Sequence, residues 1–554
     1  MSRIDAIYTR IRDADRREVF ITLRGQADVA RDYDVSVAAG GPLAGMILAV
    51  KDNVDVAGLP TTAGCPGYSY LPECDAPAVA ALRAAGAVVI GKTNLDQFAT
   101  GLVGTRSPYG AVRDSRRPDH ISGGSSSGSA VAVALGFADI AIGTDTAGSG
   151  RVPAALQGIV GIKPTIGVVS TAGVVPACAD YDVVTILAAD LASADRALSA
   201  MAAAHGPRPF GPTTPLAAPE EPVIAVPAEL PGLDAAWRAG FDNAVARAES
   251  AGMRVKTIDL RPFLAAATLL YGDALVAQRY DAVGEYIESA TADSGLDSVV
   301  AEIITSANKY SAVDFLRARR QLEQLRGEAM SEWGDAAALL VPTAPGHPRI
   351  DEVAADPVGL NSRMGIYTNF CNLFDLCGLA VPAGEITESD GGVAQFGVTF
   401  LGRAHEDAVL VDLARRFVTP GVAAPGDSPA WPETVADSVE LAVFGAHMRG
   451  GPLTHELSGR GARWAGEIAT AAAYRLVALD TIPAKPGLVR DPAGRSIRGE
   501  TWRLTPHALG EFLAALPAPM SLGRIELDDG RWVVGFGCAA DAAAAGEALD
   551  RDRW

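Results

Sequence analysis

The sequence predicts an α/β protein with a central mixed, mostly parallel sheet covered by helices, followed by a small α+β domain. Three observations predict this architecture. A chain of 554 residues is too long for one ordinary core. Short apolar runs alternate with helical segments between residues 45 and 164, which is typical of strands joined by helices. A proline-rich stretch at residues 419–437 then separates the last part of the chain.

The elements of the first region follow from their residue patterns. Residues 1–20 have the charge pattern of an amphipathic helix. Beyond them, continuous apolar runs predict buried strands, and alanine-rich segments predict helices. In chain order these are a strand at 46–52, a helix at 76–86, a strand at 87–94, a helix at 127–138 and a strand at 139–145.

Two proline-rich stretches punctuate the rest of the chain. Residues 206–222 are expected to form a surface loop. Residues 419–437 carry four prolines between Pro420 and Pro432, which keep a chain extended and stop a helix from continuing. We therefore predict a first domain at 1–418, a linker at 419–437 and a C-terminal domain at 438–554. Strands in that domain are predicted at 439–448, 474–482, 496–504 and 530–538.

Composition excludes several classes of partner and site. A net charge of -19 argues against nucleic acid, because polyanions repel one another. Six cysteines spread over a long chain are typical of a reducing compartment, and Cys371 and Cys377 lack a nearby histidine that would complete a metal site. No apolar signal-peptide core is present, and no uncharged apolar run reaches the roughly eighteen residues of a membrane span. We therefore expect a cytoplasmic protein that uses no membrane, metal or cofactor.

Residues 120–130, HISGGSSSGSA, gather five serines, and residues 124–128 match the G-x-S-x-G pattern of a nucleophile elbow. An elbow directly follows a strand, whereas the preceding residues here are polar and irregular. It also needs a histidine, and the first 430 residues contain only His120, His205, His347 and His405. None of these lies in a recognisable catalytic context, which disfavours the elbow.

A better candidate nucleophile lies in residues 139–158. The predicted strand ends at Asp145, the chain turns through small residues, and Ser149 opens a helix with Pro153 in its first turn, where proline is favoured. Successive backbone N–H groups of such a turn can point into one hollow, which is the geometry of an oxyanion hole. The alternative is that Ser149 only caps the helix.

A serine nucleophile without a histidine needs another base, and Lys51 ends a strongly apolar predicted strand. Burial disfavours the ammonium form and can lower a lysine pKa by up to about 3–5 units, which would make the amine neutral near pH 7. Two alternatives stay open. Lys51 would lie at a solvated strand end, or it would form a salt bridge with Asp52.

Taken together, these stretches resemble the amidase-signature hydrolases, a family with a Ser–cis-Ser–Lys triad. The resemblance covers the chain to about residue 420 and is carried by residues 48–66, 91–110, 122–134, 143–165 and 367–384. It implies the amidase-signature fold, with Ser149 as nucleophile, Ser125 on a cis peptide bond as bridging serine, and Lys51 as base.

The resemblance also implies how these residues act. Neutral Lys51 would take a proton from Ser125, which takes one from Ser149, and the same chain in reverse would protonate the leaving ammonia. The oxyanion hole would be formed by the backbone N–H groups of Thr146, Ala147, Gly148 and Ser149. The remaining hydroxyls, expected to cap or pack the following helix, are those of Ser126, Ser127 and Ser129.

Within that family the chain is most similar to the allophanate hydrolases, which carry an additional C-terminal domain. Residues 441–463, 474–490 and 518–538 resemble that domain, and residues 269–280 resemble the segment that binds the substrate carboxylate. The resemblance implies that Tyr271 and Arg279 hold this carboxylate, since a planar guanidinium binds a carboxylate bidentately. Without the resemblance, Arg279 is a surface-helix arginine.

The implied reaction hydrolyses allophanate, a urea that carries a carboxylate, to ammonia and carbon dioxide in urea or s-triazine nitrogen assimilation. An acyl-enzyme on Ser149 would release ammonia, and water would free N-carboxycarbamate, which loses carbon dioxide. The resemblance assigns the C-terminal domain a role in this breakdown. His447 is the first candidate there, ahead of His455 and Lys485, and its alternative is a structural histidine. We also expect a homodimer and functional pairing with a urea carboxylase.

One segment departs from the allophanate hydrolase pattern. Where those enzymes have Cys-Arg-Ser-Leu-Asp, residues 178–182 are Cys-Ala-Asp-Tyr-Asp, and a carboxylate facing the pocket would disfavour an anion. Three alternatives therefore stay open. The chain would hydrolyse another small amide, either biuret-like or an arylacetamide, or it would be a glutamine-dependent tRNA amidotransferase subunit. It would otherwise be non-catalytic, against which the three retained triad residues argue.

Overall fold

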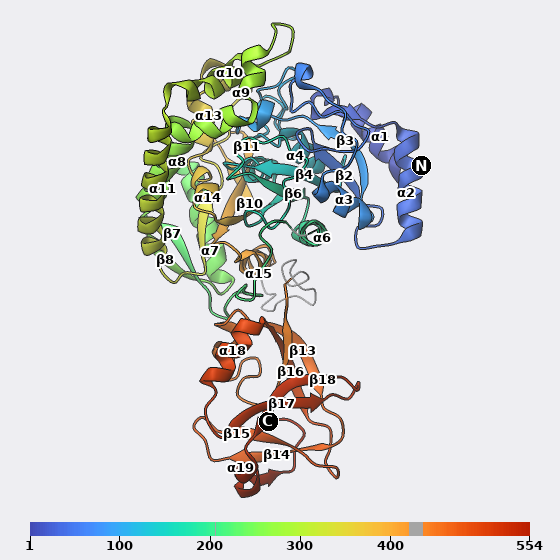
Figure 1. The fold of residues 1–554 in the computed structure, drawn as a ribbon, viewed down its shortest axis with the longest axis vertical. Helices are drawn as coiled ribbons and strands as arrows, with labels where there is room; N and C mark the ends of the chain where they lie inside the picture. Colours follow the sequence, from blue (N-terminus) through green and yellow to red (C-terminus); the bar gives the residue numbers. More distant parts are fainter. Residues whose placement is uncertain (205, 390, 420–435) are drawn as a thin grey trace. The chain divides into compact units, whose positions relative to one another are not determined.

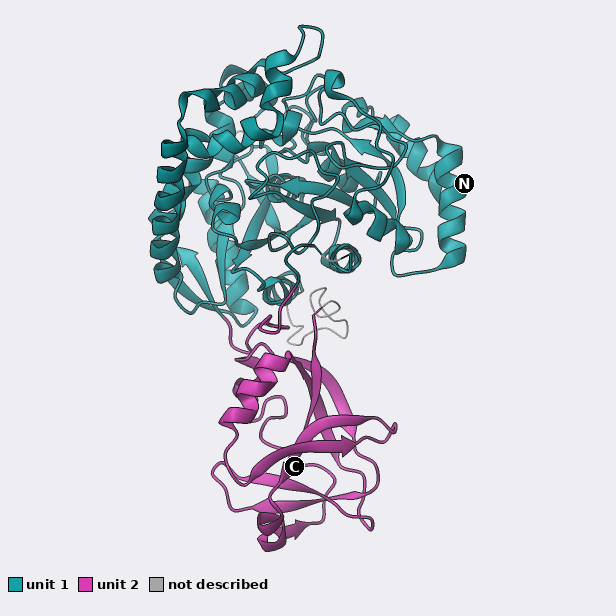
Figure 2. Cartoon of the chain, viewed as in Figure 1, with its two compact units in different colours: residues 1–209, 223–420 teal, residues 210–222, 421–554 magenta. Residues whose placement is uncertain are grey.

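The structure is a computed structural model that describes residues 1–204, 206–389, 391–419 and 436–554. It divides into two compact units, Met1–Pro209 with Val223–Pro420, and Phe210–Pro222 with Gly421–Trp554 (Figure 2). His205 and nearly all of the predicted linker at 419–437 lie outside the described residues.

An eleven-stranded mixed sheet forms the centre of the first unit (Figure 1). Its strand order is β1-β3-β2-β4-β6-β5-β10-β11-β9-β7-β8. β2 is parallel to β3 and β4, and β7 is parallel to β8 and β9, whereas the strands between these blocks pair antiparallel. The predicted α/β class with a mixed sheet is confirmed. The strands are β1 (Phe20–Leu23), β2 (Ile47–Lys51), β3 (Val88–Thr93), β4 (Ile140–Asp145), β5 (Val160–Lys163), β6 (Val183–Ala188), β7 (Val223–Pro227), β8 (Arg254–Ile258), β9 (Ala338–Pro342), β10 (Cys377–Thr387) and β11 (Val393–Gly402).

Helices cover both faces of this sheet. β2, β3, β4, β5, β6 and β9 are buried along their whole length, which requires cover on both sides because successive side chains point to opposite faces. Figure 1 shows α1 and α2 beyond β3 at one end, and α8 and α11 at the other. No helix in the described ranges is long and apolar enough to cross a membrane. The longer helices are α1 (Arg3–Asp13), α2 (Gln26–Ala39), α3 (Pro77–Ala84), α4 (Ser127–Ala134), α6 (Leu191–Ala202), α7 (Ala235–Ser250), α8 (Arg261–Gly272), α9 (Ala277–Ser289), α10 (Ser298–Thr305), α11 (Ala312–Trp333) and α15 (Asp407–Val418), and the shorter are α5 (Arg151–Gln157), α12 (Ile350–Ala355), α13 (Gly359–Met364) and α14 (Asn369–Leu373).

The five elements predicted between residues 46 and 145 all form, as β2, α3, β3, α4 and β4. The small residues of α4 have a packing reason. Gly128 lies against backbone atoms of Val19 and Asn94, where any side chain would collide. Close approach of α4 to its neighbours therefore depends on the Gly and Ala content that made this segment recognisable.

The proline-rich stretch at 206–222 forms no helix or strand and is exposed in part, as predicted, but it also contains buried residues. From Phe210 onward it belongs to the second unit. Thr214 and Leu216 are buried, and the Leu216 N–H donates to Gly461 O at 2.8 Å. Part of this loop is therefore packed against the second unit's own residues, which proline content alone does not reveal.

The second unit holds two sheets, a five-stranded one in the order β13-β16-β12-β18-β17 and a three-stranded one in the order β15-β14-β19. The four strands predicted for this region form as β12, β14, β16 and β18. α18 packs on β16 and buries Phe512 against Trp502 and Phe536 in one core cluster. The elements are β12 (Val439–Val443), α17 (Thr454–Ser458), β13 (Arg463–Ala469), β14 (Tyr474–Leu479), β15 (Lys485–Arg490), β16 (Arg498–Leu504), α18 (Pro506–Ala515), β17 (Met520–Glu526), β18 (Trp532–Cys538), α19 (Ala540–Ala545) and β19 (Glu547–Leu549).

Candidate active site

Lys51 is the last residue of β2, and its side chain is fully buried. Its Nζ lies 2.8 Å from Ser125 Oγ and 2.7 Å from Thr144 Oγ1 on β4. Burial lowers the pKa of Lys51 to about 7, while the buried carboxylates of Asp96 and Asp145 act in the opposite direction. The alternative of a solvated strand end is therefore wrong, and Lys51 has the properties of a base at neutral pH.

Asp52 does not pair with Lys51, although it is the next residue. Its carboxylate lies 3.2 Å from Lys92 Nζ on the neighbouring strand β3. It also accepts hydrogen bonds from the backbone N–H and the hydroxyl of Thr62. Among the residues that the structure describes, no carboxylate lies within ion-pair distance of Lys51, so the salt-bridge alternative is wrong as well.

Ser125 links Lys51 to the turn that contains Ser149. The Gly124–Ser125 peptide bond is cis, as the family resemblance implied. The Ser125 carbonyl accepts the Asp96 N–H at 3.2 Å, and the N–H of the following residue donates to Ser149 O at 3.2 Å. The serine cluster and the Ser149 turn therefore lie side by side, and the Ser125 hydroxyl is hydrogen-bonded to the amine of Lys51.

Two other hydroxyls of the cluster bind the sheet, and that of Ser127 donates to Asn94 O just beyond β3. Ser126 Oγ donates to Thr144 O at 3.1 Å, and Ser129 Oγ donates to Ile142 O at 2.9 Å, both on β4. Ser126 occupies the N-cap position of α4, as predicted, but its side chain makes no capping hydrogen bond and binds β4 instead. Ser126, which matches the central position of G-x-S-x-G, is thus held against β4.

Ser149 lies in the turn between β4 and α5 and is buried. The N-cap of α5 is Gly150, with no side-chain cap, so the alternative that Ser149 only caps the helix is wrong. Its Oγ donates to Gly101 O at 3.5 Å, a long contact that leaves the hydroxyl free to turn. Gly148 has φ +124° and lies against the Thr368 side chain, so no other residue fits at that position.

Asp145 holds this turn in place. Its carboxylate accepts the N–H groups of Gly148 at 2.8 Å and Gly150 at 3.1 Å, and it pairs with buried Arg151 at 3.0 Å. The Gly148 N–H is therefore engaged, and this geometry does not support its expected part in an oxyanion hole. The described chain provides no hydrogen-bond partner for the three other predicted donors, the N–H groups of Thr146, Ala147 and Ser149.

Arg279 in α9 is buried, so its interpretation as a surface arginine is wrong. Nη1 donates to Thr100 Oγ1 at 2.9 Å, and Nη2 donates to Tyr271 OH at 2.8 Å. Nε is buried without a hydrogen-bond partner, and no carboxylate of the described residues forms an ion pair with this guanidinium. The predicted pair Tyr271 and Arg279 is thus brought together, as a buried cation held by neutral oxygens.

The candidate residues Arg279 and Ser149 both contact one loop. Thr100 binds Arg279, and the carbonyl of the next residue, Gly101, accepts from Ser149. A substrate carboxylate on Arg279 would therefore lie within reach of Ser149. A buried guanidinium that lacks a carboxylate partner is costly unless an anion completes it, so Arg279 is a candidate for binding an anion.

Neither acid of the departing segment 178–182 forms an ion pair with Arg279. Asp180 is exposed and accepts from Gln278 Nε2 at 3.1 Å. Asp182 is buried and accepts from the Thr146 hydroxyl and from the backbone N–H groups of Ala177 and Cys178. Asp180, the acid by which this segment departs from the family pattern, is thus exposed and bound to Gln278, which weakens the objection that the segment raised against an anionic substrate.

The sequence did not single out Thr100, Thr144 and Lys92. Their side chains contact Arg279, Lys51 and Asp52, respectively. Thr100 contacts Arg279 across 179 residues of chain, Thr144 contacts Lys51 across 93, and Lys92 pairs with Asp52 across 40, so no local spacing relates them. Only their position inside the family-like stretches 91–110 and 143–165 could have singled them out. Across the described ranges, histidine, cysteine and carboxylate side chains form no cluster that could hold a metal ion.

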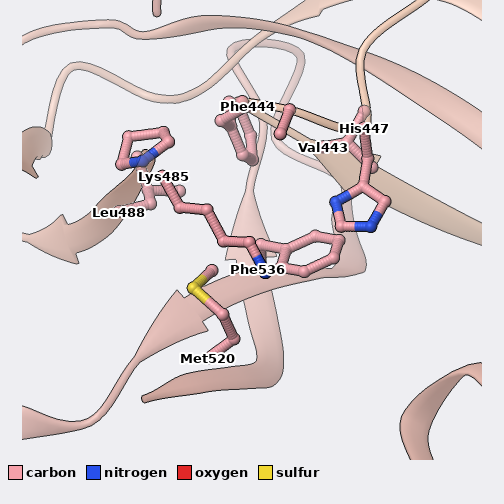
Figure 3. A pocket seen from close by; sticks show the side chains of 10 residues that line it. Val443, Phe444, His447, Lys485, Leu488, Met520 and Phe536 are labelled. Carbon is pink, nitrogen blue, oxygen red and sulfur yellow. The ribbon is translucent and has the colours of Figure 1, made fainter. Parts of the chain in front are cut away.

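A pocket in the second unit contains two of the C-terminal candidates (Figure 3). The His447 ring stacks on Phe536 with centroids 4.9 Å apart, and its Nε2 lies 2.9 Å from the Glu456 carboxylate. Burial lowers the pKa of His447, and Glu456 opposes this shift. Figure 3 shows Lys485 reaching toward Phe536 from the side opposite His447. His455 is exposed and does not line this pocket.

Comparison with known proteins accounts for both units. The amidase family profile matches residues 4–411, and the profile of the allophanate hydrolase C-terminal domain matches residues 439–550. The solved structure of Kluyveromyces lactis allophanate hydrolase is 37% identical, with a TM-score of 0.87, over 99% of this chain and 94% of that chain.

Two curated relatives separate the alternatives. Urea amidolyase of Lachancea kluyveri is 41% identical over 95% of this chain, which spans only 30% of that protein's length. The glutamyl-tRNA(Gln) amidotransferase A protein of Symbiobacterium thermophilum is 34% identical over 70% of this chain and 85% of its own length. The chain therefore belongs to the amidase family and combines the amidase fold with an allophanate hydrolase C-terminal domain.

Proposed function

We propose that this chain hydrolyses allophanate through an acyl-enzyme on Ser149, as part of urea or s-triazine nitrogen assimilation. The observation that carries the proposal is the buried Arg279, which has no carboxylate partner in the described residues and is joined to Ser149 through Thr100 and Gly101. Allophanate presents a carboxylate next to a urea amide. Tyr271 and Arg279 would bind that carboxylate and leave the amide carbon at the nucleophile.

The contact of Lys51 with Ser125, and the backbone hydrogen bond from Ser126 N–H to Ser149 O, support a proton relay through the three triad residues. Neutral Lys51 accepts a proton from Ser125, and Ser125 accepts one from Ser149 as its oxygen attacks the amide carbon. The carbonyl oxygen gains negative charge, which the free N–H groups of Thr146, Ala147 and Ser149 stabilise. Protonated Lys51 then returns its proton through Ser125 to the leaving nitrogen, and ammonia departs. Water attacks the acyl-enzyme by the same relay.

Hydrolysis of the acyl-enzyme releases N-carboxycarbamate, and we assign its breakdown to the second unit. Loss of carbon dioxide leaves the electron pair of the broken C–N bond on nitrogen, which must take up a proton. The pocket of His447 and Lys485 brings two nitrogen groups together beside apolar walls, as such an anion requires. His447 remains the first candidate for the proton transfer.

The organisation of the chain is proposed on the same basis. We infer a catalytic domain at 1–418, a linker at 419–437 and a C-terminal domain at 438–554, acting as a cytoplasmic homodimer. Allophanate is urea with an added carboxyl group, so a urea carboxylase must supply it. The name and length of the Lachancea kluyveri relative, a urea amidolyase that extends far beyond the matched part, support this pairing.

Two enzymatic alternatives remain as rivals. An amidotransferase subunit shares the first unit, but the Symbiobacterium thermophilum relative matches only 70% of this chain, and the second unit then has no role. A hydrolase of neutral amides, such as biuret, would have no use for the unpaired cation of Arg279.

Ammonia release by the purified chain distinguishes these functions. We expect release from allophanate without added partners, and its loss in Ser149→Ala. Release from biuret but not from allophanate would keep the enzyme class and reject the substrate. Release only from glutamine, and only with partner subunits, would favour the amidotransferase.

A further inference from the structure

Thr100 occupies a position between the anion site and the nucleophile. It is fully buried, and its Oγ1 donates to Phe98 O at 3.2 Å and accepts from Arg279 Nη1 at 2.9 Å. Since its single hydroxyl proton is used on Phe98, a lone pair of the oxygen is left for the guanidinium. The hydroxyl is thus oriented by the protein to accept from Arg279.

The loop that carries Thr100 is held firmly. The buried carboxylate of Asp96 accepts the N–H groups of Val103, Gly104 and Arg106. Gly101 lies directly on the Asp96 side chain, and Arg106 Nη1 donates back to Thr100 O at 2.8 Å. The backbone of Thr100, and with it the position of Oγ1, is therefore fixed by the loop and not by Arg279.

A guanidinium is planar, so fixing both of its terminal nitrogens fixes its orientation. Thr100 holds Nη1 and Tyr271 holds Nη2, each with one hydrogen bond. Arginine has five N–H groups, and the remaining ones stay available in a fixed plane. The next residue after Thr100 contacts Ser149 Oγ at 3.5 Å, so the same loop also relates this plane to the nucleophile.

We infer that Thr100 is a specificity-determining positioning residue, whose hydroxyl holds the Arg279 guanidinium so that its free N–H groups receive the substrate carboxylate in register with Ser149. This inference rests on the proposed function, because it requires an anionic substrate. It assigns Thr100 no contact with the reacting atoms. It also explains why a buried, uncharged residue is the partner of Arg279: a carboxylate there would neutralise the cation and compete with the substrate.

Thr100→Val tests the inference, because valine keeps the shape of threonine and removes the acceptor. The measurement is kcat and KM for allophanate, set against biuret, in which a neutral amide replaces the carboxylate. Biuret is measured as a substrate or, where it is not turned over, as a competitive inhibitor. We expect the preference for allophanate over biuret to fall about tenfold, mainly through KM, because a hydrogen bond to a charged group is lost.

Thr100→Ser is the matched control, since it restores the hydroxyl, and its preference should stay within about twofold of the wild type. A merely structural role would lower activity toward both compounds alike and leave the preference unchanged, which would overturn the inference. Arg279→Lys separates the two proposals. If it abolishes the preference while Thr100→Val does not, allophanate hydrolysis stands and the role of Thr100 is wrong. If the wild-type chain shows no preference for allophanate, the proposed function fails first.

Discussion

Two buried lysines lie on neighbouring strands of the first unit and have opposite environments. Lys51 ends β2, Lys92 lies on β3 beside it, and both side chains are fully buried. Lys92 has the carboxylate of Asp52 at 3.2 Å, whereas the amine of Lys51 contacts two hydroxyl oxygens. Asp52 follows Lys51 in the chain and yet pairs with the other lysine.

The difference shows how the fold separates a structural charge from a reactive amine. A buried ammonium without a counter-ion is costly, so the group gives up its proton near neutral pH. Burial lowers the pKa of both lysines. For Lys92, the negative charge of Asp52 is the strongest influence in the opposite direction. By engaging Asp52, Lys92 leaves Lys51 with neutral partners, which is the state that the proposed relay needs.

Replacing Lys51 should produce the larger loss of activity. In Lys51→Met the apolar chain is retained and the base is removed, so we expect kcat for allophanate to fall on the order of 10²- to 10⁴-fold. Stability should be unchanged or higher, because an unpaired buried amine has been replaced by an apolar group. Ammonia release and thermal unfolding of the same preparation measure both effects. Near-wild-type turnover in Lys51→Met would contradict the relay.

Replacing Lys92 should lower the stability of the protein, which replacing Lys51 should not. Lys92→Met leaves the buried Asp52 carboxylate without its counter-ion, which should lower the free energy of unfolding by about 3–5 kcal/mol. The double variant Lys92→Met with Asp52→Asn removes both charges and should recover most of this loss. Urea unfolding of the wild type, both single variants and the double variant completes the cycle. Equal stability of Lys92→Met and the wild type would show that the ion pair is not structural.

The contrast between these lysines marks what sequence could and could not predict. The strand ending at Lys51 and the turn at Ser149 were predictable, because apolar runs, proline and glycine act locally. The ion pair between Asp52 and Lys92 was not predictable, since it depends on the register between β2 and β3. Thr144 contacts Lys51 across 93 residues and Thr100 contacts Arg279 across 179. Such pairs are set by tertiary packing, which no periodicity in the sequence records.

The same limit applies to backbone donors and to proline-rich segments. The turn of small residues after β4 predicted a row of N–H groups, but not that Asp145 would engage the one of Gly148. In the stretch 210–222, prolines predicted solvent exposure, while Thr214 and Leu216 are buried. Composition predicts the local conformation of a segment, but it does not predict which other parts of the chain pack against that segment.

The pH dependence of kcat/KM is the smallest of the expected effects, and it tests the protonation state of Lys51 directly. Burial disfavours the charged form of Lys51 and brings its pKa from 10.5 down to about 7, so the amine is neutral above pH 7 and protonated below it. Activity should therefore rise with pH through about 7 and level off above, with about a tenfold loss one unit below the midpoint. An exposed lysine that keeps the ordinary pKa of about 10.4 would place this rise several units higher. Initial rates between pH 5.5 and 9.5, corrected for uncatalysed breakdown of allophanate and accompanied by circular dichroism at each pH, locate the midpoint. A rise near pH 10, or no rise at all while the protein stays folded, would mean that an amine other than a neutral Lys51 activates the nucleophile.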